Sequence, residues 1–220
     1  MQSVDKKLYL RGKGNTKFFN PSGSVTLQWR LSEKADCSGN IQTLLDYENP
    51  PTNITGSWCY DGMFRGCANL TTAPELPATT LSYCCYESMF FNCTSLTTAP
   101  ELPSTTLTQF CYHHMFEGCT SLTTAPELPA TTLMEHCYQD MFKKCTNLTT
   151  TPELPATTLA KSCYWGMFAY TKLKVNTASG NKIFTCPSSI PSGAVTEMFY
   201  ETSGAFTGTP TAGNTYYYTV

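Results

Sequence analysis

The chain has 220 residues, of which 41% are hydrophobic and 13% aromatic, which is enough for a core and argues against wholesale disorder. Charged residues make up only 14% and the net charge is −2, so there is no basic field for nucleic acid or anionic lipid. No stretch approaches the roughly 20 apolar residues needed to cross a bilayer. We therefore expect neither nucleic-acid binding nor membrane insertion.

Residues 1–50 lack the repeat that dominates the rest of the chain. Residues 8–12 and 24–31 alternate apolar and polar side chains, as half-buried strands do, and glycine-rich turns separate them. Residues 41–47 could form one helical turn or a short strand. The start of the chain has no apolar segment typical of a signal peptide, so we expect no export by that route, or a trimmed piece of a longer protein. We predict that residues 1–50 form a β-rich N-terminal cap.

Residues 51–173 contain five copies of a 26-residue unit with no insertion between them. Each copy carries Cys-Tyr and then Met-Phe, and four copies continue to a second cysteine and a leucine. The Met-Phe pairs begin at Met63, Met89, Met115, Met141 and Met167. A strict period in this range predicts a stacked solenoid, because one unit cannot bury its own apolar face.

The third copy illustrates the structure that we predict for each unit. Cys111, Met115, Phe116 and Cys119 fall at positions i, i+4, i+5 and i+8, which is one helical stripe. The segment 122–129 contains two prolines, which allow only a short strand followed by a turn. We therefore expect an α/β repeat whose units each consist of a short strand, a proline turn and a short helix.

The cysteines that recur in the repeat are predicted to form two ladders in the core rather than a disulfide framework, and Cys37, Cys84 and Cys186 lie outside these ladders as the expected exceptions. Two cysteines eight apart on a helix lie about 12 Å from one another, whereas a disulfide needs Cα atoms within roughly 7 Å. The spacing also lacks the paired C-x-x-C pattern of zinc sites. Reduced, buried thiols are favoured, and some disulfides remain the alternative. The expected repeat core comprises Cys59, Phe64, Cys67, Cys85, Phe90, Cys93, Cys111, Phe116, Cys119, Cys137, Phe142, Cys145, Cys163 and Phe168.

After Phe168 the repeat decays. Thr171 stands where the second cysteine should be, and a last echo of the Met-Phe pair appears at Met198-Phe199. The final residues, 209–220, are rich in tyrosine and threonine and predict a closing strand. We predict that residues 174–220 form a degenerate repeat and a C-terminal β cap.

The repeated run F-x-x-C-x-x-L, followed by a segment that ends in proline, resembles the BspA-type leucine-rich repeats of surface proteins from anaerobic bacteria and some protozoa. In the third copy the matching residues are Met115, Phe116, Cys119, Leu122, Leu128 and Pro129. The match covers roughly residues 57–173. This resemblance implies a curved leucine-rich-repeat solenoid in a surface-exposed or secreted protein, with a role in adhesion to host matrix proteins or other cells.

The differences between the copies indicate where a ligand could bind. Positions that are identical in every copy are expected to be fixed by packing, and positions that vary are free of the core. Several variable positions carry large aromatic or imidazole side chains, which are natural anchors in interfaces. The candidate binding residues are Tyr83, Phe91, Phe110, His113, Trp165 and Tyr170. Neutral drift of surface positions is the alternative explanation.

Metal and catalytic sites have weaker support. Glu75, Glu101, Glu127 and Glu153 occupy the same position in four copies and could form a carboxylate row that binds Ca²⁺, or could simply extend into water. His113 and His114 are adjacent, and adjacent histidines on a helix point about 100° apart, so we expect no metal site there. No catalytic triad, phosphate-binding loop or cofactor motif is present in the sequence.

We therefore predict a non-enzymatic binding or adhesion module without a cofactor, at the cell surface or secreted. Its varied face would contact a protein or glycan, such as host matrix or a cell surface, and the module would act as a monomer. Two alternatives remain open. Similar cassettes in gut phage and prophage proteins suggest a receptor-binding or tail-associated module, and a repeat array can also serve as a structural spacer.

Overall fold

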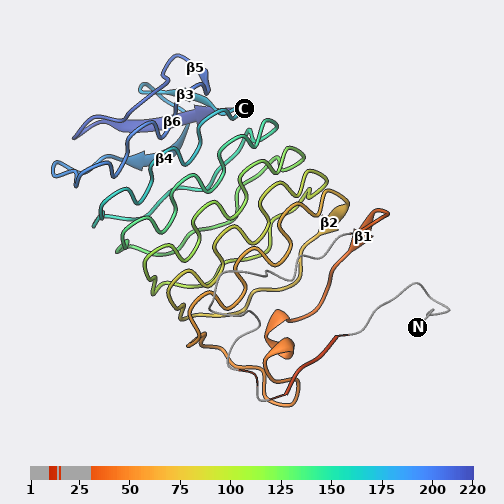
Figure 1. Ribbon diagram of the computed structural model, residues 1–220. Helices are drawn as coiled ribbons and strands as arrows, with labels where there is room; N and C mark the ends of the chain where they lie inside the picture. The colour runs from red at the N-terminus through yellow and green to blue at the C-terminus, as the bar shows by residue number, and fades with distance from the viewer. Residues whose placement is uncertain (1–9, 14, 16–30) are drawn as a thin grey trace.

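A computed structural model describes residues 10–13, 15 and 31–220 (Figure 1). Its elements in chain order are β1 (Ala35–Asp36), a 3-10 helix η1 (Ile41–Leu44), β2 (Leu70–Thr72), β3 (Lys174–Asn176), β4 (Asn181–Thr185), β5 (Ser203–Gly204) and β6 (Thr215–Thr219). The strands predicted over 8–12 and 24–31 lie largely outside the described residues. None of the described segments forms a helix with the length and apolar character that crossing a bilayer requires.

The predicted leucine-rich-repeat solenoid of five strand–turn–helix units is wrong. Across the described residues, η1 is the one helical element, and it lies before the repeats. The segments expected to be helices are runs of turns in which every fourth residue has a left-handed backbone, for example Phe110 (φ 58°), His114 (φ 54°) and Gly118 (φ 75°). A backbone period of four places i, i+4 and i+8 on one side, much as a helical period of 3.6 does. The apolar pattern therefore could not separate the two structures.

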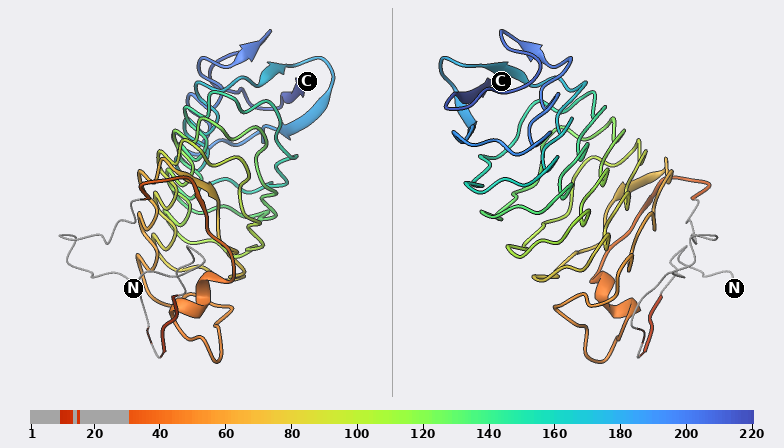
Figure 2. Two further views of the ribbon diagram at one scale, coloured as in Figure 1. Left: turned by 90° about the vertical axis from the view of Figure 1, so that its right-hand side faces the viewer. Right: turned by 60° about the vertical axis from the view of Figure 1, so that its left-hand side comes forward.

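Hydrogen bonds explain how these turn segments are held without helices. Within a copy, Met115 N–H donates to Tyr112 O (3.2 Å) and Cys119 N–H donates to Phe116 O (3.0 Å). Between copies, Tyr112 N–H donates to Cys137 O (3.1 Å) and Phe116 N–H donates to Met141 O (3.0 Å). The N–H groups thus alternate between a partner in their own turn and a partner in the next copy, which satisfies the buried backbone. Successive copies lie side by side in a stack (Figure 2).

The core consists of rows of identical side chains, one from each copy. The phenylalanine row runs through Phe64, Phe90, Phe116, Phe142 and Phe168 to Phe199, with neighbouring rings 5.5–6.0 Å apart and nearly parallel. A parallel tyrosine row joins Tyr60, Tyr86, Tyr112, Tyr138 and Tyr164 at 5.7–5.9 Å. Stacked rings of one kind contribute both apolar burial and a favourable ring geometry. This packing explains why the same residues recur at a fixed interval.

All twelve cysteines are free thiols, and all except Cys37 are buried. The second cysteine of a copy has a specific partner, because Cys119 Sγ donates to the carbonyl oxygen of Phe90 in the preceding copy (3.1 Å). Cys93 and Cys145 make the same bond to Phe64 and Phe116. Burial raises the pKa of the Cys163 thiol to about 11, so this thiol stays protonated at neutral pH. The buried thiols therefore act as small packing residues, and those of Cys93, Cys119 and Cys145 each donate one weak hydrogen bond.

The proline-containing part of the unit forms little regular sheet. Only the first copy has a strand there, β2, which pairs in parallel with β1. Later copies make isolated parallel bridges, such as Thr72–Thr98 and Thr124–Thr150. The predicted short strand in every unit is therefore wrong, because prolines remove the donors that a continuous ladder needs.

At the C-terminal end, a sixth turn segment and a small sheet follow the fifth copy (Figure 1). Ala194, Val195, Met198 and Phe199 occupy the inward positions of this segment and are buried. The sheet has the strand order β4-β6-β3-β5, with β6 antiparallel to β3 and β4. Tyr216 of β6 stacks on Phe184 of β4 at 5.6 Å. The sheet thus brings its own aromatic cluster against the last turn segment.

Candidate binding face

The outward residues of the turn segments form one face of the stack, which we call the turn face. The segments are 57–66, 83–92, 109–118, 135–144, 161–170 and 192–201. Inward positions in the first five segments repeat Cys, Tyr, Met and Phe, whereas the outward positions differ from copy to copy. The turn face is therefore the surface on which this chain presents different chemistry along an almost constant backbone.

Aromatic rings form a row on the turn face across the first four copies. Trp58 and Tyr83 meet edge to face at 5.1 Å, and Tyr83 and Phe110 do so at 5.8 Å. His136 then stacks flat on Phe110 at 4.5 Å. Trp58 and Tyr83 are 40% and 37% exposed, while Phe110 is half-buried. Sequence reasoning missed Trp58 and His136, although both occupy the same slot in the unit as Phe110.

A second aromatic group lies at the C-terminal end of the turn face. Trp165, Tyr170 and Tyr200 are 39–41% exposed, and Tyr170 and Tyr200 meet edge to face at 5.5 Å. The remaining aromatic candidate, Phe91, is half-buried beneath the guanidinium of Arg65, which lies 4.4 Å from the ring centre. Tyr200 comes from the sixth segment, where the sequence shows only a weak echo of the repeat.

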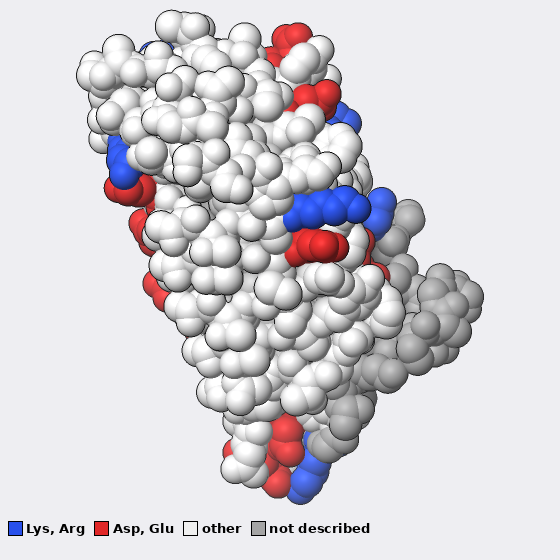
Figure 3. All heavy atoms as spheres, turned by 90° about the vertical axis from the view of Figure 1, so that its left-hand side faces the viewer, with Lys and Arg blue, Asp and Glu red and all other residues white. Residues whose placement is uncertain are grey.

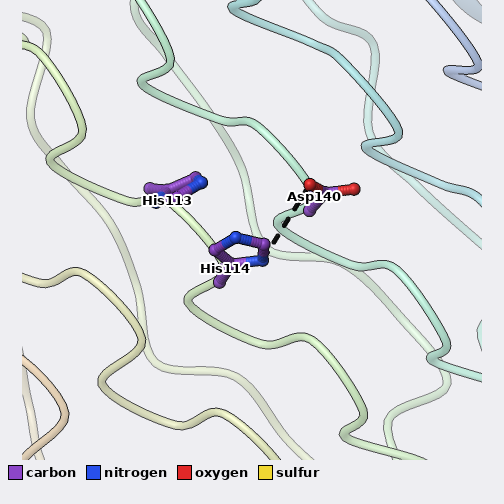
Figure 4. Close-up of side chains that lie close together, drawn as sticks. All are labelled: His113, His114 and Asp140. Atoms are coloured by element: carbon purple, nitrogen blue, oxygen red, sulfur yellow. Dashed lines mark ion pairs between the residues drawn. The ribbon is translucent and has the colours of Figure 1, made fainter.

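The turn face also carries a network of histidines and carboxylates, of which Figure 4 shows His113, His114 and Asp140. His113 Nδ1 lies 3.1 Å from Glu87 Oε1, and His114 Nδ1 lies 2.6 Å from Glu117 Oε2. Burial opposes ionisation of both glutamates, but the histidine contacts outweigh it, so the pKa of each glutamate is lowered. The pKa of Asp61 shifts in the opposite direction. Burial, and next the nearby Glu87, raise the pKa of Asp61 to about 6.

The expectation that His113 and His114 point far apart is wrong. Their ring centres are only 3.8 Å apart, because His114 adopts a left-handed turn instead of continuing a helix. His136 lies outside this pair, on Phe110. Asp140, from the next copy, approaches the pair: its Oδ2 lies 4.0 Å from His114 Nδ1. His113, His114 and Asp140 are the one group of three or more potential metal ligands found among the described residues.

The glutamate row does not form a metal site. Glu75, Glu101, Glu127 and Glu153 are all exposed, and no three of these described side chains converge on one point. Glu153 is instead paired with Lys182 of β4 at 2.8 Å. Figure 3 shows a face of the molecule on which uncharged residues predominate and charged residues lie in small groups near its margins. The predicted row of carboxylates around a cation is thus not supported.

A cavity of about 180 Å³ lies at the N-terminal end of the stack. The described residues that line it are mostly apolar and include Ile41, Leu44, Met63 and Phe64, with Asp36 as the one carboxylate among them. Ile41 and Leu44 of η1 also belong to the core. The cavity therefore belongs to the packing of the first copy against η1 and offers no pair of acid–base groups.

Comparison with known proteins identifies no relative: no family model, no curated protein and no solved structure matches this chain. The resemblance to BspA-type repeats stays a prediction. Functional conclusions must therefore come from the chemistry of the turn face itself.

Proposed function

We propose that this chain is a non-enzymatic binding module that contacts a protein or a glycan through its turn face, at a cell surface or in a secreted protein. The observation that carries the proposal is the placement of the exposed rings of Trp58, Tyr83, Trp165, Tyr170 and Tyr200 on this one varied face. Aromatic side chains are enriched among residues that dominate binding energy. They also lose little conformational entropy when a ligand covers them.

The surroundings of these rings support the same function. Edge-to-face contacts such as Trp58–Tyr83 and Tyr170–Tyr200 restrict the rings before any ligand arrives. Preorganisation of this kind lowers the cost of binding. The inter-copy hydrogen bonds hold the backbone beneath the rings, so the face is a rigid platform rather than a set of loose loops. A low overall charge favours recognition by stacking and hydrogen bonding over electrostatic attraction.

The test is a binding screen of the chain against immobilised glycans and extracellular matrix proteins. A Tyr83→Ala/Trp165→Ala double variant should weaken the strongest interaction at least tenfold, because each ring is an exposed anchor. Tyr47→Ala is the matched control, since Tyr47 is equally exposed but lies outside the turn face. Unchanged binding by the double variant, or no binding by the wild type to either class, would contradict the proposal.

A further inference from the structure

The structure assigns a second property to the turn face, beyond the proposed function: a transition-metal site formed by His113, His114 and Asp140. One ligand atom from each of these residues lies within 4.8 Å of the other two. We propose that Zn²⁺ or a similar ion binds the two imidazoles and the carboxylate. Two histidines and one carboxylate form a ligand set that zinc accepts while keeping a further position open.

The carboxylates around the two histidines favour metal binding over a simple pair of rings. Glu87 Oε1 faces Nδ1 of His113, and Glu117 Oε2 faces Nδ1 of His114. An imidazole that donates its Nδ1 proton to a carboxylate keeps its Nε2 lone pair free for an ion. Metal-binding histidines in proteins nearly always have such an outer partner, which orients the ring and raises its basicity. Both histidines therefore have the outer contacts of metal ligands.

Asp140 can contribute an oxygen to this site. Its side chain is only 7% exposed, and it already contacts Lys143 through Oδ1 (3.0 Å) and Gln139 through Oδ2 (3.2 Å). Each carboxylate oxygen has two lone pairs, so these contacts leave Oδ2 able to bind an ion as well. Gly166 in the following copy gives the carboxylate its space, because a Cβ atom there would overlap Oδ1.

The backbone and the local charge also suit a cation. His114 N–H donates to Gln139 O (3.0 Å) and Asp140 N–H donates to Trp165 O (2.8 Å), so the inter-copy bonds hold both ligands in place. The cluster holds three carboxylates, from Glu87, Glu117 and Asp140, and two lysines, of which Lys143 contacts Asp140 and Lys144 contacts Glu117. With neutral imidazoles, these three carboxylates and two lysines have a net charge of −1. Binding of a divalent ion would change the net charge of the cluster to +1. The rings of His113 and His114 are 14% and 27% exposed, which leaves an approach from solvent.

Titration of the metal-free full chain with Zn²⁺ in a calorimeter tests this site. We expect one ion per chain, with affinity at least tenfold lower in His114→Asn and Asp140→Asn, since asparagine tolerates the left-handed backbone that both positions adopt. Glu87→Ala should reduce the affinity about 10- to 100-fold, because it removes the outer contact to His113. Glu201→Asn is the matched control, because it removes a turn-face carboxylate outside the cluster at another left-handed position and should leave the affinity unchanged.

Two further measurements keep the proposal testable even if a variant fails to fold. In the wild type, Zn²⁺ should shift the imidazole nitrogen resonances of His113 and His114 and leave those of His136 in place. Bound Co²⁺ should show no thiolate charge-transfer absorption, although Cys84 lies beside Glu87. No zinc binding by the wild type, an equal effect of Glu201→Asn and His114→Asn, or a cobalt–thiolate band would each overturn the proposed ligand set.

Discussion

The inward and outward sides of the same turn segments follow opposite rules. On the inward side, each Phe of the row stacks on an identical residue in the next copy, so a change in one copy disturbs both neighbours. On the outward side, rings and charges meet different partners in each copy, for example Tyr83 with Phe110 and His113 with Glu87. One backbone therefore carries a constant core and a variable surface. This separation lets binding chemistry change without changing the fold.

The largest expected effect comes from a break in the phenylalanine row. Phe116 is fully buried between Phe90 and Phe142, so Phe116→Ala should lower the free energy of unfolding by about 3–5 kcal/mol. The outward variant Tyr83→Ala should change the same quantity by less than about 1 kcal/mol. Urea denaturation measures both values. Equal losses in the two variants would contradict the division between the two sides.

The left-handed positions allow a finer comparison between two glycines. Gly66 and Gly118 have nearly the same backbone (φ 73° and 75°), but a Cβ atom on Gly118 would overlap Asn92 Oδ1, whereas one on Gly66 meets nothing within 4 Å. Gly66→Ala should cost about 1–2 kcal/mol for backbone strain alone. Gly118→Ala should cost more, measured by the same denaturation.

A matched double variant then isolates the overlap. In an Asn92→Ala background, which removes the obstructing side chain, the cost of Gly118→Ala should fall back towards the Gly66→Ala value. Asn92→Ala alone is the reference, because Asn92 is itself left-handed (φ 57°). If Gly118→Ala alone costs no more than Gly66→Ala, the inferred contact between copies is wrong.

The smallest expected effect concerns Asp61 and depends on pH. Its folded-state pKa is about 6, mainly through burial and next through Glu87, and exceeds the value near 3.9 of an exposed aspartate. The folded state therefore holds the proton more tightly, and stability falls as pH rises from about 4 to about 6. Asp61→Asn should raise the free energy of unfolding by on the order of 1 kcal/mol at pH 7.5, after allowance for solvent screening.

This gain should shrink as the pH is lowered through 6 towards 4, where the wild-type carboxyl takes up its proton. Unfolding of both proteins at several pH values measures the difference. A gain that is independent of pH would show that the substitution acts through packing and not through charge.

Sequence reasoning could predict the period and the inward residues, because a 26-residue repeat and an invariant Cys, Tyr, Met and Phe pattern are visible without a structure. Parallel bridges such as Thr72–Thr98 keep the 26-residue register. The local conformation could not be predicted. The left-handed positions carry Trp58, Cys84, Phe110 and Lys144 among others, and these residue types do not favour such a backbone on their own. Bonds between copies stabilise it, and no pattern within one copy reveals them.

The candidate site shows the same limit. The varied aromatic positions were visible from an internal comparison of the copies, and Tyr83, Trp165 and Tyr170 are exposed. The approach of His113, His114 and Asp140 was hidden, because it depends on the turn geometry of two neighbouring copies. The glutamates at one position were easy to see, yet they extend outward without converging.

The most direct test of the account transfers five outward residues of the fifth copy into the third, while every inward residue and Gly118, where a Cβ atom would overlap Asn92, are kept. The substitutions are Gln109→Lys, Phe110→Ser, His113→Trp, His114→Gly and Glu117→Ala. We predict an unchanged circular dichroism spectrum without helical bands and a melting temperature within about 5 °C of the wild type, since surface changes are worth little. Unfolding of this variant would contradict the claim that the inward rows and inter-copy hydrogen bonds carry the fold.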